Sequence, residues 1–146
     1  MLFTQPPFVD SMNKVEALQY LKENHRGVLA TVKKDGRPQL SNIGYLYDTD
    51  GLVKISTTAD RFKARNIQRD PQVSMVAQGP NWYEYIVVEG TATVGPEGQL
   101  AELRHLYEGI AGKPHPNWAE YDAAMLNDHR VIISITIEKI YPLDKE

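Results

Sequence analysis

The sequence predicts a mainly β protein, a small closed or nearly closed antiparallel barrel with helices at its periphery. Three strand-like segments are followed by a short helix, two strands, two helices and a last strand, which is not the alternating pattern of a parallel sheet. Neither the early nor the late strands carry enough apolar residues for a core of their own, so they must share one. The length of 146 residues fits one domain. We assign 1–146 to a single domain, with 1–12 as an irregular N-terminal arm.

Regular structure is expected to begin with a short amphipathic helix over 13–24. Asn13 and Glu16 form the capping-box pattern of a helix start, and apolar residues follow at helical spacing. Two β-rich segments come next, 27–34 and 38–47. The Lys-Asp-Gly sequence between them favours a hairpin turn.

The middle of the chain is expected to hold two strands with a basic helix between them. A strand over 52–58 leads into a short helix over 60–69. Asp60 is the candidate N-cap of this helix. Pro71 ends it, because the residue before a proline disfavours the helical conformation. The next strand covers 73–78.

The second half is expected to contain two long strands that enclose two helices. Apolar and polar residues alternate over 83–94 and again over 131–141, which is typical of half-buried strands. A helix over 99–111 has one apolar face and is followed by Gly112, a common helix end. A second capping-box pattern opens a helix over 117–127.

The composition excludes several classes of chemistry. The chain has no cysteine, which removes disulfides, cysteine–zinc sites, iron–sulfur clusters and thiol nucleophiles. A net charge of −3 argues against general affinity for nucleic acid. The charge is unevenly distributed, because residues 1–73 carry 11 basic and 8 acidic side chains whereas residues 74–146 carry 5 and 11. An anion site would therefore use a local basic patch in the first half.

Several common motifs are missing from the sequence. It has neither the glycine-flanked serine of many hydrolases nor a nucleotide-binding glycine motif. The four histidines show no metal-ligand spacing, so we expect no metal site, and His105 is expected on a helix surface.

The sequence shows no signal peptide pattern and no apolar segment near the roughly 20 residues of a membrane span. The cytoplasm is the expected compartment, without a membrane partner.

The strongest functional signal is the segment 56–66, where a strand ends in three hydroxyl residues and runs into a basic helix. A helix N-terminus presents unpaired N–H groups and the positive end of the dipole, and arginine matches phosphate geometry. The basic side chains are Arg61, Lys63, Arg65 and Arg69. On an ideal helix the three arginines share a stripe and the lysine points elsewhere, so the four cannot all contact one anion. The segment predicts a phosphate site; the alternative is a solvated basic helix face.

A second candidate is the strand segment 37–42. Alternation puts Gln39 and Ser41 on one face, with Leu40 and Asn42 on the other. Amides and hydroxyls in the middle of a strand are what a polar heterocycle would need. The alternative is an exposed strand face.

A third candidate is the aromatic segment 81–85, which includes Trp82, Tyr83 and Tyr85. These residues would form a stacking wall for an aromatic ligand. Aromatic residues at a strand start also serve core or interface packing, and that alternative stays open.

Taken in order, five short segments resemble a known family. They are GVLATV at 27–32, DGRPQLSN at 35–42, RFKARNI at 61–67, RDP at 69–71 and VEGTA at 88–92. This series resembles the flavin/deazaflavin split-barrel proteins, the pyridoxamine 5′-phosphate oxidase-like superfamily. It is most similar to the actinobacterial branch that uses the deazaflavin coenzyme F420. The resemblance extends over about residues 13–142.

The resemblance implies a split β-barrel homodimer with two cofactor sites at the subunit interface. The residues implied to hold the cofactor phosphate are Ser56, Thr57, Arg61, Lys63 and Asn66. Those implied to lie near the ring system are Gln39, Ser41 and Asn42. Those implied to approach from the partner subunit are the segment 82–85, which includes Tyr85, and Arg130.

The chemistry that the resemblance implies is hydride transfer from the reduced deazaflavin to an electron-poor small molecule. The alternatives are an FMN-dependent oxidase or reductase of the same fold and a non-catalytic cofactor-binding protein. We find no C-terminal pyridoxal-phosphate-binding signature, which disfavours vitamin B6 oxidation. Tyr45, Tyr85 and His129 are candidate proton donors. Nothing in the sequence selects one of them, so the catalytic residue stays unknown.

Overall fold

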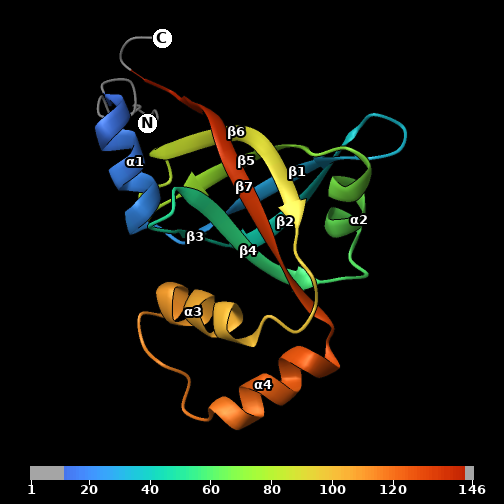
Figure 1. Ribbon diagram of the computed structural model, residues 1–146. Helices are drawn as coiled ribbons and strands as arrows, with labels where there is room; N and C mark the ends of the chain where they lie inside the picture. The colour runs from blue at the N-terminus through green and yellow to red at the C-terminus, as the bar shows by residue number, and fades with distance from the viewer. Residues whose placement is uncertain (1–11, 144–146) are drawn as a thin grey trace.

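The computed structural model describes residues 12–143, so the expected arm over 1–12 lies, except for Met12, outside the described residues. The strands form one seven-stranded antiparallel sheet in the order β2-β1-β5-β6-β7-β4-β3, which curls into a half-open barrel (Figure 1). The strands are β1 (Arg26–Val32), β2 (Pro38–Gly44), β3 (Leu46–Tyr47), β4 (Leu52–Thr58), β5 (Gln72–Gln78), β6 (Tyr85–Val94) and β7 (Arg130–Tyr141). This confirms the expected split-barrel class.

Helices surround the sheet at the positions that the sequence predicts. In the described part of the chain they are α1 (Lys14–Glu23), α2 (Phe62–Arg69), α3 (Leu100–Ala111) and α4 (Trp118–Asn127). In Figure 1, α1 lies at the end near the termini, α2 flanks the sheet at the right, and α3 and α4 lie together below it. The expected capping box begins α1: Glu16 N donates to Asn13 Oδ1 at 2.9 Å, and Asn13 N donates to Glu16 Oε1 at 3.1 Å.

The strand expected over 38–47 is wrong in one respect, because the structure divides it at Tyr45. β2 pairs with β1, whereas β3 pairs with β4, and β2 and β3 are the two edges of the sheet. Tyr45 itself is fully buried, and its hydroxyl donates to the Leu21 carbonyl oxygen of α1 at 2.7 Å. Tyr45 therefore links β2 at one edge of the sheet to β3 at the other edge.

The main core lies inside the curled sheet, where alternate residues of each strand point. On β6 the buried side chains include Ile86, Val88 and Ala92. A register shift after Glu89 interrupts the pairing of β6 with β7. A Cβ atom at Gly90 would lie only 2.0 Å from the Thr136 carbonyl oxygen, so a side chain at this position would prevent the close crossing of β6 and β7.

A second, smaller core joins α3 and α4 to the outside of the sheet. Leu103 and Leu106 of α3, Tyr121 of α4 and Ile132 of β7 are buried together. The Tyr121 hydroxyl donates to the Leu103 carbonyl oxygen at 2.8 Å, which links the two helices. α3 ends at Gly112, whose φ of 75° is the left-handed conformation that the sequence predicts there.

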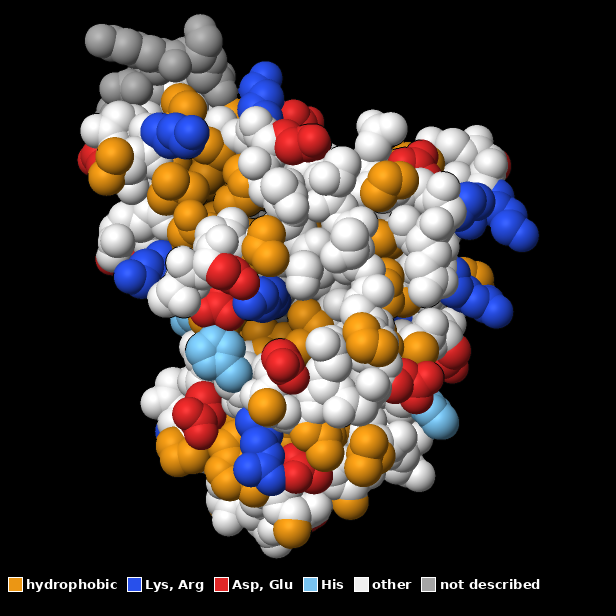
Figure 2. Space-filling model, in the orientation of Figure 1, with side chains coloured by type: hydrophobic (Ala, Val, Ile, Leu, Met, Phe, Trp, Pro, Cys, Tyr) orange, Lys and Arg blue, Asp and Glu red, His pale blue; other side chains and the backbone are white. Residues whose placement is uncertain are grey.

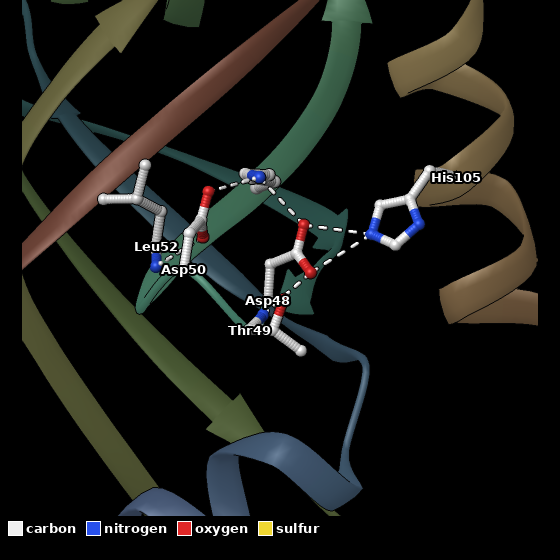
Figure 3. A network of polar contacts seen from close by, with 6 residues as sticks. Asp48, Thr49, Asp50, Leu52 and His105 are labelled. Atoms are coloured by element: carbon white, nitrogen blue, oxygen red, sulfur yellow. Dashed lines mark hydrogen bonds and ion pairs between the residues drawn. The ribbon is translucent and has the colours of Figure 1, made fainter.

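A polar network also attaches α3 to the turn between β3 and β4 (Figure 3). The Lys54 ammonium donates to Asp48 Oδ2 at 2.8 Å, and the exposed His105 ring of α3 lies 3.0 Å from the same oxygen. Burial raises the pKa of Asp48, but the hydrogen bonds from Lys54 and His105 outweigh this effect and hold it well below its ordinary value. Asp48 is therefore an ionised anchor between the barrel and α3.

The described helices are all too short or too polar to cross a membrane. Across residues 12–143, no group of three or more His, Cys, Asp or Glu side chains is arranged to hold a metal ion.

Candidate functional site

The basic segment lies where β4 ends and α2 begins. The predicted N-cap, Asp60, is wrong: its carboxylate instead accepts a hydrogen bond from the Thr58 hydroxyl at 2.7 Å. Arg61 takes the N-cap position in an extended conformation and makes no side-chain cap bond. The first N–H groups of α2 are therefore without a side-chain cap, which leaves donors for an anion.

Three cations converge at this end of α2. Burial lowers the pKa of Lys63, and the positive charges of Arg61 and Arg130 nearby lower it further. None of the three forms an ion pair with a carboxylate among the described residues, and the buried Nε of Arg130 has no hydrogen-bond partner there. We call Arg61, Lys63 and Arg130 the cation cluster.

Arg130 is a residue that the resemblance implied would come from the partner subunit. In the structure β7 begins beside the end of β4, where Arg130 pairs with Thr58, and the charge of Arg130 acts on Lys63 of its own chain. Asp60 is the acidic residue that immediately precedes Arg61 in the sequence. The hydrogen bond from Thr58, followed by the charges of Arg61 and Arg65, lowers its pKa.

The two hydroxyl residues predicted to join the phosphate site point in opposite directions. Thr57 is buried and pairs with Val131 on the inner face of the sheet. Ser56 is partly exposed and pairs with Ile132 on the outer face, which α3 and α4 cover. Successive strand residues face opposite sides, so the two hydroxyls cannot contact one anion together.

The predicted residues Gln39 and Asn66 contact each other directly. Asn66 is buried, and its Nδ2 donates to Gln39 Oε1 at 2.9 Å and to Thr31 Oγ1 at 3.0 Å. Its Oδ1 accepts from Arg69 Nη2 at 2.9 Å. Both Nδ2 hydrogens of Asn66 are thus used to hold α2 against β1 and β2.

Ser41 follows Gln39 on the same face of β2. Its hydroxyl oxygen is buried and has no hydrogen-bond partner among the described residues. Buried polar atoms are nearly always satisfied, so an unsatisfied hydroxyl indicates a partner that residues 12–143 do not supply.

Asn42 and Tyr85 lie on the other, outer face of the sheet. Asn42 pairs with Val28, which in turn pairs with Val76 of β5. Tyr85 belongs to the neighbouring row. The structure therefore does not bring these two predicted residues to the cation cluster within one chain.

A cleft of about 580 Å³ lies between α2 and the turn that joins β1 to β2. The residues that line it are Lys33, Lys34, Gln39, Phe62, Arg65, Asn66 and Arg69. The lining has no carboxylate, and Figure 2 shows Lys and Arg side chains gathered at the right-hand edge of the molecule, over α2. The sequence analysis missed the two lysines and the exposed Phe62. Two adjacent lysines before a turn were the signal that could have found them.

A second cleft of about 650 Å³ lies on the other side of α2. Arg61 and Arg65 line it, but so do Asp60, Glu97 and Asp128. In the first cleft, by contrast, every charged side chain of the lining is basic, so that cleft is the better match for an anionic ligand.

The structure separates the three candidate proton donors. Burial raises the pKa of Tyr45 far above its ordinary value, and its hydroxyl is engaged by α1, so Tyr45 is not a proton donor. His129 lines the mixed cleft, and its Nδ1 lies 2.6 Å from Glu97 Oε1. Tyr85 is partly buried on the outer face of β6.

Known proteins resemble the chain along most of its length. The curated relative F420H(2)-dependent biliverdin reductase of Mycobacterium tuberculosis is 27% identical over 130 residues, which are 86% of this chain and 84% of that protein. A solved structure described as an F420 reductase is 28% identical with a TM-score of 0.65, and covers 84% of this chain and 94% of its own. A conserved hypothetical protein from Mycobacterium tuberculosis is 26% identical with a TM-score of 0.72, and covers 94% of this chain and 88% of its own.

The family is established by a match that spans nearly the whole described chain. The model of the pyridoxamine 5′-phosphate oxidase family matches residues 14–144, from the start of α1 to beyond β7. The antiparallel split barrel and the basic start of α2 agree with that match. The chain therefore belongs to the pyridoxamine 5′-phosphate oxidase family of flavin- or deazaflavin-dependent oxidoreductases.

Proposed function

We propose that the protein binds coenzyme F420 and reduces an electron-poor small molecule with its reduced form. The observation that carries this proposal is the cation cluster, three converging positive charges without a carboxylate partner in the described chain. The names of two relatives, an F420H(2)-dependent biliverdin reductase and an F420 reductase, support the choice of cofactor. When bound, the coenzyme supplies the hydride, and the protein supplies binding and orientation.

The unsatisfied polar atoms of the chain fit such a cofactor. The Arg130 Nε and the Lys63 ammonium are donors for a phosphate, together with the uncapped N–H groups of α2. The Ser41 hydroxyl and the Gln39 amide lie on the inner face of β2 and would meet the polar edge of the ring. Among the described residues, the Ser41 hydroxyl and the Arg130 Nε are buried polar atoms without a hydrogen-bond partner, which a bound cofactor would supply.

We further propose that two copies of the chain complete the site as a homodimer. On the outer face of the sheet, Val28, Val76 and Val87 form a partly exposed apolar row that continues from Asn42. Leu40 on the same face is 67% exposed. A second copy packed on this face would cover the row and bring Tyr85 and Asn42 to a shared interface. The expected compartment is the cytoplasm.

FMN is the second candidate cofactor, because the matching family is defined by pyridoxamine 5′-phosphate oxidase. FMN ends in a phosphate monoester, whereas F420 continues through a phosphodiester into an oligoglutamate tail. The basic cleft beside α2 extends the positive charge beyond the cation cluster. The added positive charge around the site favours the cofactor with more negative charges, which is F420.

The proposal is tested by cofactor titration. The protein is expressed in a host that lacks F420 and titrated with F420 and with FMN, following the fluorescence of Trp82 and Trp118. We expect saturable quenching by F420, and turnover with one or more members of a panel of enones, quinones and tetrapyrroles. Tight binding of FMN with no binding of F420 would contradict the proposal. Binding of F420 without any turnover would favour a non-catalytic cofactor-binding protein.

A further inference from the structure

The amide of Asn66 connects Arg69 of α2 with Gln39 of β2. Arg69 Nη2 donates one hydrogen bond to the Val32 carbonyl oxygen at 2.6 Å and another to Asn66 Oδ1 at 2.9 Å. On its other side, Asn66 Nδ2 lies 2.9 Å from Gln39 Oε1 and 3.0 Å from Thr31 Oγ1. The contacts form one continuous chain from a cation to the amide of Gln39.

This chain of contacts has only one consistent direction. The oxygen and nitrogen of an amide side chain are normally assigned from their hydrogen-bond partners. A guanidinium group has donors and no acceptor, so the atom of Asn66 that faces Arg69 must be the oxygen. The Nδ2 group of Asn66 then faces Gln39 and donates, and the atom of Gln39 that receives this bond must be its oxygen.

The bond from Asn66 determines which group of the Gln39 amide is available in the basic cleft. With its oxygen held by Asn66, the Gln39 side chain has its NH₂ group left, and that group has no partner among the described residues. Gln39 lines the basic cleft beside α2. The NH₂ group is therefore the part of the Gln39 amide that has no partner and is available to a ligand in the cleft.

We propose that Arg69, acting through Asn66, fixes the Gln39 amide so that it donates a hydrogen bond to an acceptor atom of the bound cofactor ring. The inference rests on the proposed function, because it takes the ligand at Gln39 to be the ring of F420 or FMN. Arg69 and Asn66 are positioning residues, and Gln39 is the residue that contacts the ring. The acceptor is a ring carbonyl oxygen or an unprotonated ring nitrogen, and hydrogen bonds of this kind tune the electronic state of the ring.

The first test compares four variants of the full-length protein. Gln39→Met removes the donor without adding charge, and Arg69→Met removes the group that orients Asn66. Arg69→Lys keeps a donor-only cation. Lys34→Met removes the same unit of charge from the same cleft without touching Asn66. The readouts are the dissociation constant and the visible absorption maximum of the bound cofactor.

Gln39→Met is expected to weaken binding about tenfold, the effect of one lost hydrogen bond of about 1.4 kcal/mol, and to shift the absorption maximum. Arg69→Met should produce the same spectral shift although Arg69 makes no contact with the ring, and Arg69→Lys should restore the wild-type spectrum. Lys34→Met is expected to alter affinity alone. The double variant of Gln39→Met with Arg69→Met should show no spectral shift beyond that of either single variant, because both act on one bond. Additive shifts, or a spectrum of Arg69→Met equal to that of Lys34→Met, would overturn the proposal.

A second measurement uses the wild-type protein and does not depend on the folding of any variant. The side-chain amide signals of Gln39 and Asn66 are followed by ¹⁵N NMR during cofactor titration. We expect the Gln39 NH₂ signals to move strongly and those of Asn66, which are already bonded, to move little. The reverse pattern would overturn the proposal. If F420 does not bind the wild-type protein, the proposed function fails. If F420 binds but the Gln39 signals stay in place, the contact of Gln39 with the ring fails while the proposed function stands.

Discussion

Arg61 and Lys63 are the residues on which the proposed phosphate site depends most directly. Replacing both by alanine should weaken cofactor binding by about 2–4 kcal/mol, since each charged hydrogen bond contributes about 1.5–3 kcal/mol and the two are not fully additive. The measurement is titration by tryptophan fluorescence. The control removes two exposed charges elsewhere, with Lys22→Ala and Lys113→Ala. Equal affinities in the two double variants would show that the basic run is only a solvated helix face.

Asp48 links local electrostatics to the stability of the fold. Its pKa is lower in the folded protein than in the unfolded chain, so its stabilising effect is present above the unfolded pKa of about 4 and is lost as the pH falls through the folded value. Asp48→Asn should therefore destabilise the protein by about 1–3 kcal/mol at pH 7. The difference from wild type should shrink below about pH 4. Urea unfolding across pH measures it.

Asp50 provides the control for this prediction, because it also bonds Lys54 but is far more exposed. Asp50→Asn should change the stability by less than about 1 kcal/mol. A constant difference between wild type and Asp48→Asn at all pH values would mean that the charge of Asp48 contributes nothing to stability.

Among the elements, the crossing of β6 and β7 should tolerate substitution least. Gly90→Ala would place a Cβ atom 2.0 Å from the Thr136 carbonyl oxygen, a backbone atom that cannot yield as a flexible side chain would. The expected loss of stability is about 3 kcal/mol, at the upper end of the range for overpacking. Gly98→Ala is the matched control, because its position has a positive φ but open space around it. It should cost about 1 kcal/mol. Thermal unfolding of both variants measures the two losses of stability. Equal losses in Gly90→Ala and Gly98→Ala would show that β7 can move aside.

The helices and strands show which parts of the fold can be predicted from local sequence patterns. Alternation and capping residues predicted each helix and nearly every strand, because these are local consequences of periodicity. The pattern could not show that the chain changes sheet edges at Tyr45, since that depends on a hydroxyl bond to Leu21 of α1. The same holds for the site. The basic run of α2 could be predicted from the sequence, but Arg130 lies near it only because β7 pairs with β4, some seventy residues away in the sequence. In the same way, the partners of Asn66 on α2 are side chains of β1 and β2.

At the scale of the whole molecule, the negative net charge and the basic cleft are compatible because acidic and basic residues lie in different parts of the molecule. Most of the basic residues of the first half lie on α2, just before it, or beside the β1–β2 turn, while the second half carries the excess of acid. A small anionic cofactor responds to the local charge around it, since interactions between exposed charges fade over about 10 Å in ordinary salt. The net charge of the chain therefore says little about this site.

The outer face of the sheet decides whether one chain or two form the complete site. Leu40→Asp places a charge on the exposed face of β2, where it should prevent a second copy from packing while leaving the fold intact, since the native side chain is already 67% exposed. We expect the wild-type protein to sediment as a dimer and the variant as a monomer with an unchanged circular dichroism spectrum. If the partner completes the ring site, the variant should also bind the cofactor at least tenfold more weakly. A monomeric variant with wild-type affinity would place the whole site within one chain, and a monomeric wild-type protein would remove the homodimer from the proposal.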